Sequence, residues 1–262
     1  MPDGSVAPDL RYVVVLGLLV LAAVAVAGLT GLGTARASLT ASLRAGAQLL
    51  VVAGLIVVVL RSWWTTAAFV VVMFTVASLT SARRIGRLAV TGWAGLAIAA
   101  GAAGPLILIL VAGVVPAAPV SVIPIVGIVV GGAMTATSLA GRGAIKNLEA
   151  RFGEYEAALA LGFSGRDAAM LICRPAARDA LVPALDQTRT VGLVTLPGAF
   201  VGVLLGGGSP LQAGAVQLLV LLALLAAETT SAVVTLELVA RKRIPWAPRG
   251  QTSYRRRPVL GS

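Results

Sequence analysis

Side chains able to do acid–base or metal chemistry are scarce in this sequence. It contains no histidine, and Cys173 is its only cysteine. The commonest general base, the commonest transition-metal ligand and a thiolate cluster are therefore missing, which excludes Ser-His-Asp catalysis, an HExxH zinc site and a histidine proton relay. The two lysines, Lys146 and Lys242, lie outside any GxxxxGK[ST] phosphate loop, so the chain is not expected to be an enzyme or to need a cofactor.

The remaining candidates for chemistry are acidic and thioether side chains within apolar runs. Asp186 and Arg189 are three residues apart, so on a helix they share one face and can pair. Glu228 lies deeper in its run, and a charge at the centre of a bilayer costs about 2.5–3.5 kcal/mol, so it usually faces a cavity or a partner. Carboxylate and thioether groups can bind metal ions, which makes Asp186, Glu228 and Met134 candidate metal ligands. Each candidate has an alternative role. Asp186 can form an interfacial salt bridge with Arg189, Glu228 can make an interhelical contact, and Met134 can simply pack in the core.

The runs that hold these side chains have the composition of membrane spans. Hydrophobic residues make up 58% of the chain and charged residues 12%, with a mean hydropathy of +0.96. Soluble domains have about 25% charged residues, and a helix needs about 20 apolar residues to cross the hydrocarbon core. The sequence predicts an all-α integral membrane protein with about seven transmembrane helices, at residues 12–32, 45–60, 63–80, 88–115, 119–140, 186–208 and 211–239.

Basic residues are distributed unevenly between alternate loops. They collect after the first, third and fifth runs and in the carboxyl-terminal tail, whereas the opposite side has only Arg11 and Arg61. Because basic loops are retained in the cytoplasm, this asymmetry predicts an amino terminus outside and a carboxyl terminus inside. A basic inner face next to anionic membrane lipid then explains the net charge of +11, and no nucleic-acid partner is expected.

The long cytoplasmic loop, about residues 141–185, contains the stretch EAALALGFSGRDAAMLICRP, residues 156–175. Upstream of it, apolar residues recur at intervals of three and four, which predicts that the fifth span continues as an amphipathic rod. Gly162 is expected to end this rod, and the Ser-x-x-Asp pattern of Ser164 and Asp167 predicts a capping box that opens a second helix. The result is a cytoplasmic helix-turn-helix, for which a solvated amphipathic hairpin is the alternative.

The spacing within this stretch resembles the EAA loop of ABC-transporter permeases, EAA-x3-G-x9-I-x-LP. One departure is Arg174, where that family prefers leucine. In the family the loop is a coupling helix that docks into a groove on a cytoplasmic ATPase subunit, with small alanines for close docking, an acid for basic partner groups and a glycine for the turn. The resemblance implies an ABC ATPase partner and assigns ATPase coupling to Glu156, Ala157, Ala158, Gly162, Ser164, Asp167, Ile172 and Pro175.

From Val122 to the end of the last run, the chain resembles the FetB permease family, bacterial membrane subunits implicated in iron efflux with plant relatives linked to aluminium tolerance. The likeness is carried by VIPIVGIVVGGAMTATSL, ALGFSGRDAAMLICRPAARDALVPALDQTRTVGLVTLPG and GVLLGGGSPLQAGAVQ, and earlier by SLRAGAQLL and SARRIGR. It implies a multi-pass protein of the bacterial cell membrane that works as a homodimer with a separate ATPase. The candidate transport pathway consists of Gln48, Met134, Asp186, Arg189 and Glu228.

We expect residues 1–243 to form a permease domain and residues 244–262 a disordered cytoplasmic tail. The expected function is the membrane-spanning subunit of an ABC transporter that exports a metal ion, iron. The direction is in tension, because EAA loops are typical of importers whereas the FetB family is associated with export. Two alternatives remain: a secondary carrier that couples to protons through Asp186 or Glu228, and a membrane scaffold whose hairpin only recruits a cytoplasmic partner.

Overall fold

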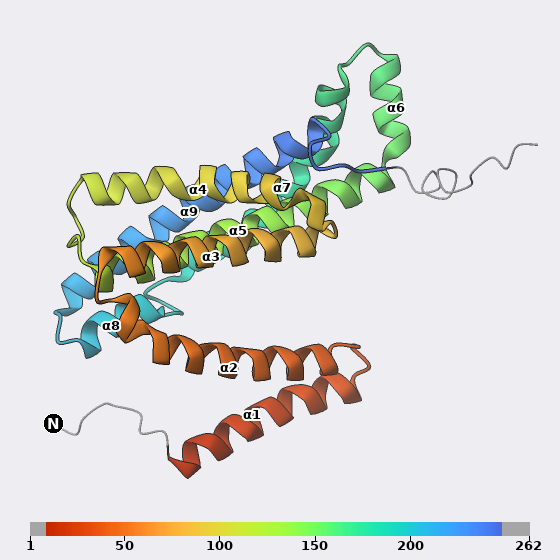
Figure 1. Cartoon of the computed structure of the whole chain (residues 1–262). Coiled ribbons are helices and arrows are strands. Elements are labelled where there is room, and N and C mark those ends of the chain that lie inside the picture. Colours follow the sequence, from red (N-terminus) through yellow and green to blue (C-terminus); the bar gives the residue numbers. More distant parts are fainter. Residues whose placement is uncertain (1–8, 248–262) are drawn as a thin grey trace, which may run out of the picture. The chain divides into compact units, whose positions relative to one another are not determined.

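A computed structural model describes residues 9–247, and the regular elements in this range are helices (Figure 1). In chain order they are α1 (Leu10–Leu29), α2 (Ala35–Val59), α3 (Trp63–Ile85), the 3₁₀ turn η1 (Leu88–Val90), α4 (Thr91–Val111), α5 (Pro119–Ala150), α6 (Phe152–Ala160), α7 (Gly165–Thr190), α8 (Gly198–Leu205) and α9 (Pro210–Ala240). The prediction of an all-α protein is confirmed for the described part of the chain.

Contacts divide the chain into two compact units, residues 1–65 and 66–262. In the first unit, α1 and α2 form a hairpin whose turn contains Gly31 and Gly33, both with positive φ. One residue is buried in each of these two helices. Long apolar helices with so much exposed surface are suited to contact with lipid.

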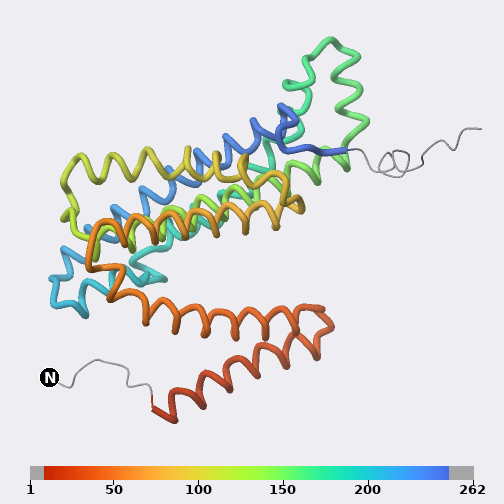
Figure 2. Tube along the Cα trace, in the orientation of Figure 1, coloured from red at the N-terminus to blue at the C-terminus, as the bar shows by residue number. Residues whose placement is uncertain are grey.

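The second unit is a bundle with α5 and α9 at its centre, and both of these helices contact α4 and α7 (Figure 2). Small residues let the helices approach closely. A Cβ added to Gly101 of α4 would lie 2.0 Å from Oγ of Ser231 and 2.4 Å from the carbonyl oxygen of Ala227, both on α9. A Cβ added to Gly132 of α5 would lie 2.1 Å from Cδ1 of Leu224 on α9. Close packing of small residues is the usual way in which helices associate where lipid surrounds them.

Six helical segments in the described range are long and apolar enough to cross a membrane: α1, α2, α3, η1 with α4, α5 and α9. The predicted sixth span, residues 186–208, is not among them, so the prediction of about seven continuous spans is wrong at this point. α7 ends at Thr190 and α8 begins at Gly198. Gly192 between them has a φ of 83°, and Pro197 precedes α8 in an extended conformation. A left-handed glycine and a proline each interrupt a helix, and together they divide this run into two short segments.

Two other boundaries differ from the predicted segments. α2 begins at Ala35, ten residues before the predicted run. Its first turns are polar, but the Thr40 hydroxyl donates to the carbonyl oxygen of Arg36 at 2.9 Å, so the helix satisfies its own polar groups. At the other end, Ile244 and Trp246 are buried, although the sequence assigned them to the tail, and residues 248–262 of that tail lie outside the described range.

Candidate functional site

The segment between α5 and α7 folds as a short helix followed by a tight turn. Arg151 leaves the helical conformation, with a φ of −113°, so the predicted continuous rod is interrupted between α5 and α6. At the end of α6, Gly162 has a φ of 90°, its N–H donates to the carbonyl of Leu159 at 3.0 Å, and Phe163 N–H donates to the carbonyl of Ala158 at 3.1 Å. This pair of bonds is the Schellman arrangement, which favours glycine. The prediction that Gly162 ends the helix is confirmed.

Ser164 caps the amino terminus of α7. Its Oγ accepts a hydrogen bond from the backbone N–H of Asp167 at 3.1 Å, and its hydroxyl donates to the Asp167 carboxylate at 2.7 Å. The predicted capping box is therefore half formed, because the acidic side chain bonds the serine hydroxyl and not the serine backbone N–H. The bond from Ser164, with a smaller contribution from Arg166, lowers the pKa of Asp167. The resulting carboxylate lies in the first turn of α7, where the helix dipole favours a negative charge.

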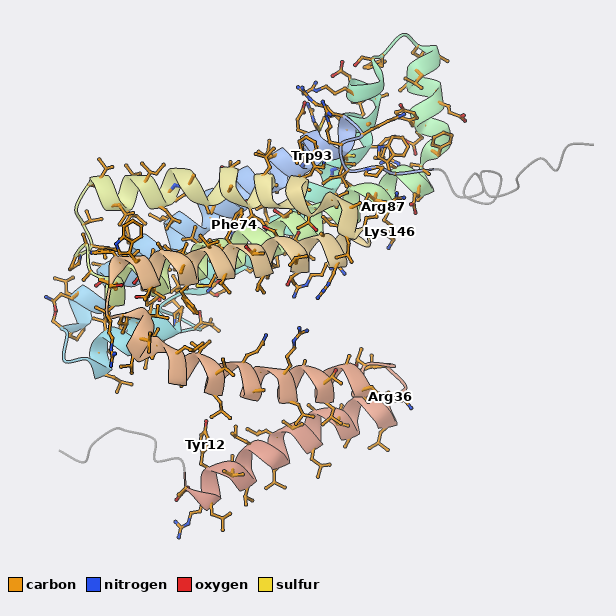
Figure 3. All side chains as sticks on the ribbon, in the orientation of Figure 1. Tyr12, Arg36, Phe74, Arg87, Trp93 and Lys146 are labelled. Atoms are coloured by element: carbon orange, nitrogen blue, oxygen red, sulfur yellow. The ribbon has the colours of Figure 1, made fainter. Side chains whose placement is uncertain are left out.

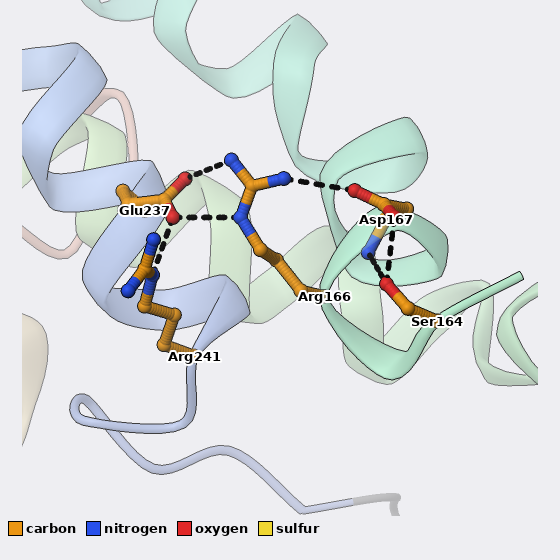
Figure 4. A network of polar contacts seen from close by, with 5 residues as sticks. All are labelled: Ser164, Arg166, Asp167, Glu237 and Arg241. Carbon is orange, nitrogen blue, oxygen red and sulfur yellow. Dashed lines mark hydrogen bonds and ion pairs between the residues drawn. The ribbon is translucent and has the colours of Figure 1, made fainter.

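A chain of ion pairs connects the start of α7 to the end of α9 (Figure 4). Arg166 donates to both carboxylate oxygens of Glu237, from Nε at 2.7 Å and from Nη2 at 2.8 Å, and its Nη1 donates to Asp167 at 2.8 Å. Glu237 also accepts a hydrogen bond from Arg241, the residue that directly follows α9. The bonds to Glu237 raise the pKa of Arg166. A two-pronged Arg–carboxylate contact fixes orientation as well as distance, so it holds α7 in one position against α9.

Aromatic side chains pack α6 against the segment that follows the carboxyl-terminal end of α9. Tyr155 of α6 meets Trp246 edge to face, with ring centroids 5.0 Å apart, and Phe152 lies 6.3 Å from the same indole. The indole N–H of Trp246 donates to the carbonyl oxygen of Val239 at 3.2 Å, which satisfies the polar group of a buried ring. α6 is therefore attached to the bundle by side chains that follow α9 in the sequence.

The predicted coupling residues extend from α6 through the turn into α7. Glu156, Ala157, Gly162, Ser164, Asp167 and Pro175 are exposed, Ala158 is half-buried and Ile172 is buried. The tip of the turn also presents two apolar side chains that the sequence analysis did not select, Leu161 at 80% exposure and Phe163 at 46%. The sequence contains a signal for them, because an apolar residue beside a helix-ending glycine commonly packs against the helix that it follows. Here both side chains are exposed instead.

The same end of the second unit is basic. Arg87, which follows α3, and Lys146, near the end of α5, lie at the end of the unit that carries α6 (Figure 3). Arg241, Lys242 and Arg243 follow α9 and are exposed. The guanidinium of Arg243 lies over the ring of Trp93 at 5.3 Å, and Lys242 lies over Trp246 at 5.4 Å.

Cys173 lies on the buried face of α7, in the core of the bundle, and has no exposed surface. We expect its thiol to resist a maleimide in the folded protein, because the sulfur cannot reach the reagent, and to react once SDS has unfolded the chain. Mass spectrometry of the purified protein before and after denaturation measures this difference. Equal labelling in the two states would show that α7 does not pack as described.

The candidate pathway residue Glu228 is buried at the contact between α9 and α5. It is 7% exposed, and its carboxylate makes no hydrogen bond or ion pair within the described part of the chain. Gly132 of α5 faces it, since a Cβ there would lie 2.6 Å from Oε1 of Glu228. Met134 is half-buried two residues further along α5, among the apolar side chains of the core. Glu228 and Met134 therefore belong to neighbouring turns of two packed helices.

The other candidate pathway residues are separate from this contact. Asp186 and Arg189 form the predicted ion pair, with Oδ1 and Nη1 3.7 Å apart, on an exposed face of α7. Gln48 is exposed on α2, in the first unit. Among residues 9–247, no group of three or more His, Cys, Asp or Glu side chains is arranged to hold a metal ion.

A cavity of about 510 Å³ lies where α7 gives way to α8. It is lined mainly by apolar residues of α5, α8 and α9, together with the amides of Gln187 and Gln217. Gln217 is 4% exposed, and its Oε1 accepts a hydrogen bond from Phe200 N–H at 3.3 Å, in the first turn of α8. The sequence analysis missed Gln217, although a glutamine in an apolar run is a recognisable signal of a buried polar contact. The interruption between α7 and α8 is thus stabilised by a side chain of α9.

Comparison with known families shows where the chain belongs. Residues 10–244 match an uncharacterised protein family, UPF0014. The chain is a member of that family. With six apolar helices of sufficient length, it is a membrane protein like its UPF0014 relatives. The resemblance to the FetB permease family that the sequence predicted is confirmed by this match and by the relatives themselves.

Three known proteins have related sequences over part of their length. Protein ALUMINUM SENSITIVE 3 of Arabidopsis thaliana is 38% identical over 140 residues, 53% of this chain and 51% of the relative. STAR2 of Oryza sativa subsp. japonica is 36% identical over 165 residues, 62% and 58% of the two chains. Probable iron export permease protein FetB of Escherichia coli (strain K12) is 32% identical over 147 residues, 56% and 57%. The chain spans little more than half the length of these relatives, and no solved structure matches it.

Proposed function

We propose that this chain is the membrane-spanning permease subunit of an ABC transporter that exports a metal ion, with energy from a separate ATPase subunit. The observation that carries the proposal is the α6–turn–α7 segment. It presents Glu156 and Ala157 outward and is fixed to α9 through Glu237. A surface that is exposed and also attached to a spanning helix is what a coupling element needs, because a push on the surface then moves the helix.

The tip of the segment supports contact with another protein. Leu161 and Phe163 are exposed apolar side chains at the basic end of the second unit, and Glu156, on the helix that leads into the same turn, is exposed as well. Exposed apolar groups rimmed by polar residues are typical of protein contacts, and the carboxylate suits a partner with basic groups. We infer that an ATPase subunit binds Glu156, Ala157, Leu161 and Phe163.

The orientation follows from the basic end of the second unit. Arg87 and Lys146 lie at the end that carries α6 (Figure 3), and basic residues flanking spans are retained in the cytoplasm. We propose that this end is cytoplasmic, as an ATP-dependent partner requires. Two copies of the chain, each with one ATPase subunit, would form the transporter in the bacterial cell membrane. The relative named as a probable iron export permease supports iron as the cargo and export as the direction.

A proton-coupled carrier is the second candidate, because Glu228 is a buried carboxyl without a partner in the described chain, and ionisable residues within spans commonly relay protons. The two functions are distinguished by the purified chain in vesicles. The carrier predicts metal transport driven by a proton gradient without ATPase, whereas the permease predicts transport only with the ATPase and ATP.

The proposal is tested by co-expression with the ABC ATPase encoded nearest to this chain, followed by capture on a tag. We expect the native chain to retain the ATPase and the Glu156→Lys variant to lose at least about tenfold of it, because the substitution reverses the charge in the docking surface. Gly162→Val should have a similar effect, since valine is strained at a φ of 90° and would displace the tip.

Glu154→Lys is the matched control. It makes the same charge reversal on the same helix, but two residues away, which places it about 200° round the helix axis from Glu156. Its ion pair with Arg151 is exposed and contributes little to stability. Retention of the ATPase by Glu156→Lys as well as by Glu154→Lys would contradict the proposed docking surface.

A further inference from the structure

α7 combines a polar surface with a position beside spanning helices. Its 26 residues are enough to cross a membrane, but it is too polar to qualify as a span, and it packs along both α5 and α9. Gln187 of α7 lines the same cavity as Ile128 of α5 and Leu221 of α9, which lie within the apolar runs of those helices. Asp186 and Arg189, the neighbours of Gln187 along α7, are therefore at the depth of the hydrocarbon core.

The two faces of α7 differ in character. Its inner face consists of small and apolar residues buried against the bundle, among them Ile172, Ala176, Ala180 and Ala184. Its outer face is exposed and carries five charged side chains, which are Arg174, Arg178, Asp179, Asp186 and Arg189. We call these five residues the charged face of α7. Charged side chains at membrane depth, here Asp186 and Arg189, face protein or water and not lipid, so a protein surface or a water-filled space must border this face.

The sequence limits what that surface is. No acidic residue occurs between residues 10 and 148, so α1 to α4 contain none that could neutralise the three arginines of the charged face. The charged face itself carries both signs, with Asp186 one turn from Arg189. When two copies are related by a two-fold axis along the membrane normal, the two α7 helices lie at equal depth, and Asp186 of one can meet Arg189 of the other.

We propose that the charged face of α7 faces the same face of a second copy of this chain, and that the two faces line an aqueous pathway through the membrane. This inference rests on the proposed permease function and assigns its pathway to α7. The ion pair that each chain forms within itself, Asp186 with Arg189, is then free to exchange for the pair between copies when the pathway opens or closes.

The test places a single cysteine at Val182, which lies within the outer face and is 49% exposed. Cys173→Ala, a small change at a buried site, supplies the background. Two differently tagged copies are co-expressed without any ATPase, and membranes are treated with a short thiol cross-linker. We expect a product that carries both tags. We also expect Val182→Cys to react with a charged, water-soluble thiol reagent at least about tenfold faster than Leu108→Cys, because a thiol ionises and reacts only where water reaches it.

Leu108 is the matched control, since it is an apolar residue of α4 with 69% exposure. If Val182→Cys gives no product with both tags and reacts as slowly as Leu108→Cys, α7 faces lipid and the proposal is wrong. If Val182→Cys instead cross-links within one chain to Gln48→Cys, the α1–α2 hairpin covers the charged face, and the proposal is equally wrong.

A charge exchange provides a second measurement that does not depend on cysteine. Asp186→Arg should convert dimers to monomers in detergent, because Arg189 of each copy then faces an arginine of the other copy and not Asp186. Adding Arg189→Asp should restore dimers. Mass photometry gives the oligomeric state, and a monodisperse elution profile shows that each variant is folded. Dimers that persist in Asp186→Arg contradict the proposal. This measurement is independent of ATPase capture. A dimer that binds no ATPase would contradict the proposed transporter function and not the α7 contact. A chain that binds an ATPase but forms no dimer would contradict only the α7 contact.

Discussion

Replacing Gly101 with alanine is expected to destabilise the second unit by about 1–3 kcal/mol, the range for overpacking a close contact. The new methyl group would lie 2.4 Å from the carbonyl oxygen of Ala227 and 2.0 Å from Oγ of Ser231. A backbone carbonyl cannot rotate away, so α4 must move from α9. That movement also weakens the 3.1 Å hydrogen bond from the Ser231 hydroxyl to the carbonyl of Ala97. The midpoint of unfolding of the purified protein in increasing SDS measures the loss.

Gly104→Ala is the control for this prediction. Gly104 lies three residues further along α4, and a Cβ there would have no atom within 4 Å. We expect this variant to be as stable as the native chain or more stable by up to about 1 kcal/mol, since alanine is the better helix former. If the two variants have the same stability, α4 and α9 do not approach as closely at Gly101 as the structure shows.

Glu237→Ala is expected to uncouple the proposed ATPase from the bundle while leaving the fold intact. The variant removes the carboxylate that holds Arg166, and with it the two-pronged contact between α7 and α9. The two side chains of the pair are 46% and 26% exposed, and solvent screens a partly exposed pair, so we expect the unfolding midpoint to change less than the hydrolysis rate. The rate of ATP hydrolysis should fall by about tenfold, because α9 is no longer held to the segment formed by α6, the turn and the start of α7. A tenfold change lies within the usual range of coupling free energies. The readout is the rate of ATP hydrolysis by the assembled complex.

Arg241→Ala is the matched control, because Arg241 directly follows α9, binds Glu237 and makes no bridge to α7. It should leave the hydrolysis rate near that of the native complex. Hydrogen exchange across residues 152–167 gives a second readout that needs no ATPase, and protection there should fall in Glu237→Ala alone. Equal protection and equal hydrolysis in both variants would remove the assigned role of Glu237.

The features that the sequence predicted correctly depend on residues close together in the chain. Apolar runs of sufficient length predicted most of the spanning helices, because burial of the backbone in lipid leaves a helix as the available form. The helix end at Gly162, the capping by Ser164 and the pair of Asp186 with Arg189 each arise within a few residues. Geometry of this kind depends on neighbouring residues in the sequence and needs no contact with a distant segment.

The interruption between α7 and α8 shows where local reasoning failed. Residues 186–208 are apolar enough on average to suggest one span, and the sequence contains Gly192 and Pro197 as signals of a break. The hydrogen bond between Gln217 and Phe200 holds the second segment in place, and this contact comes from another helix. A break is stable only if its free backbone groups find partners, so its presence depended on the position of α9.

The sequence by itself determined that this is a helical membrane protein with one basic end and an exposed turn at Gly162, because hydropathy, charge and backbone geometry are properties of short stretches. Only the tertiary structure decided that Arg166 meets Glu237, 71 residues away, and that Trp246 packs on Tyr155. It also separated Gly101 from Gly104, which are alike in sequence but differ in whether α9 lies against them. Contacts between distant segments depend on how helices pack, and that choice involves the volumes of many side chains at once.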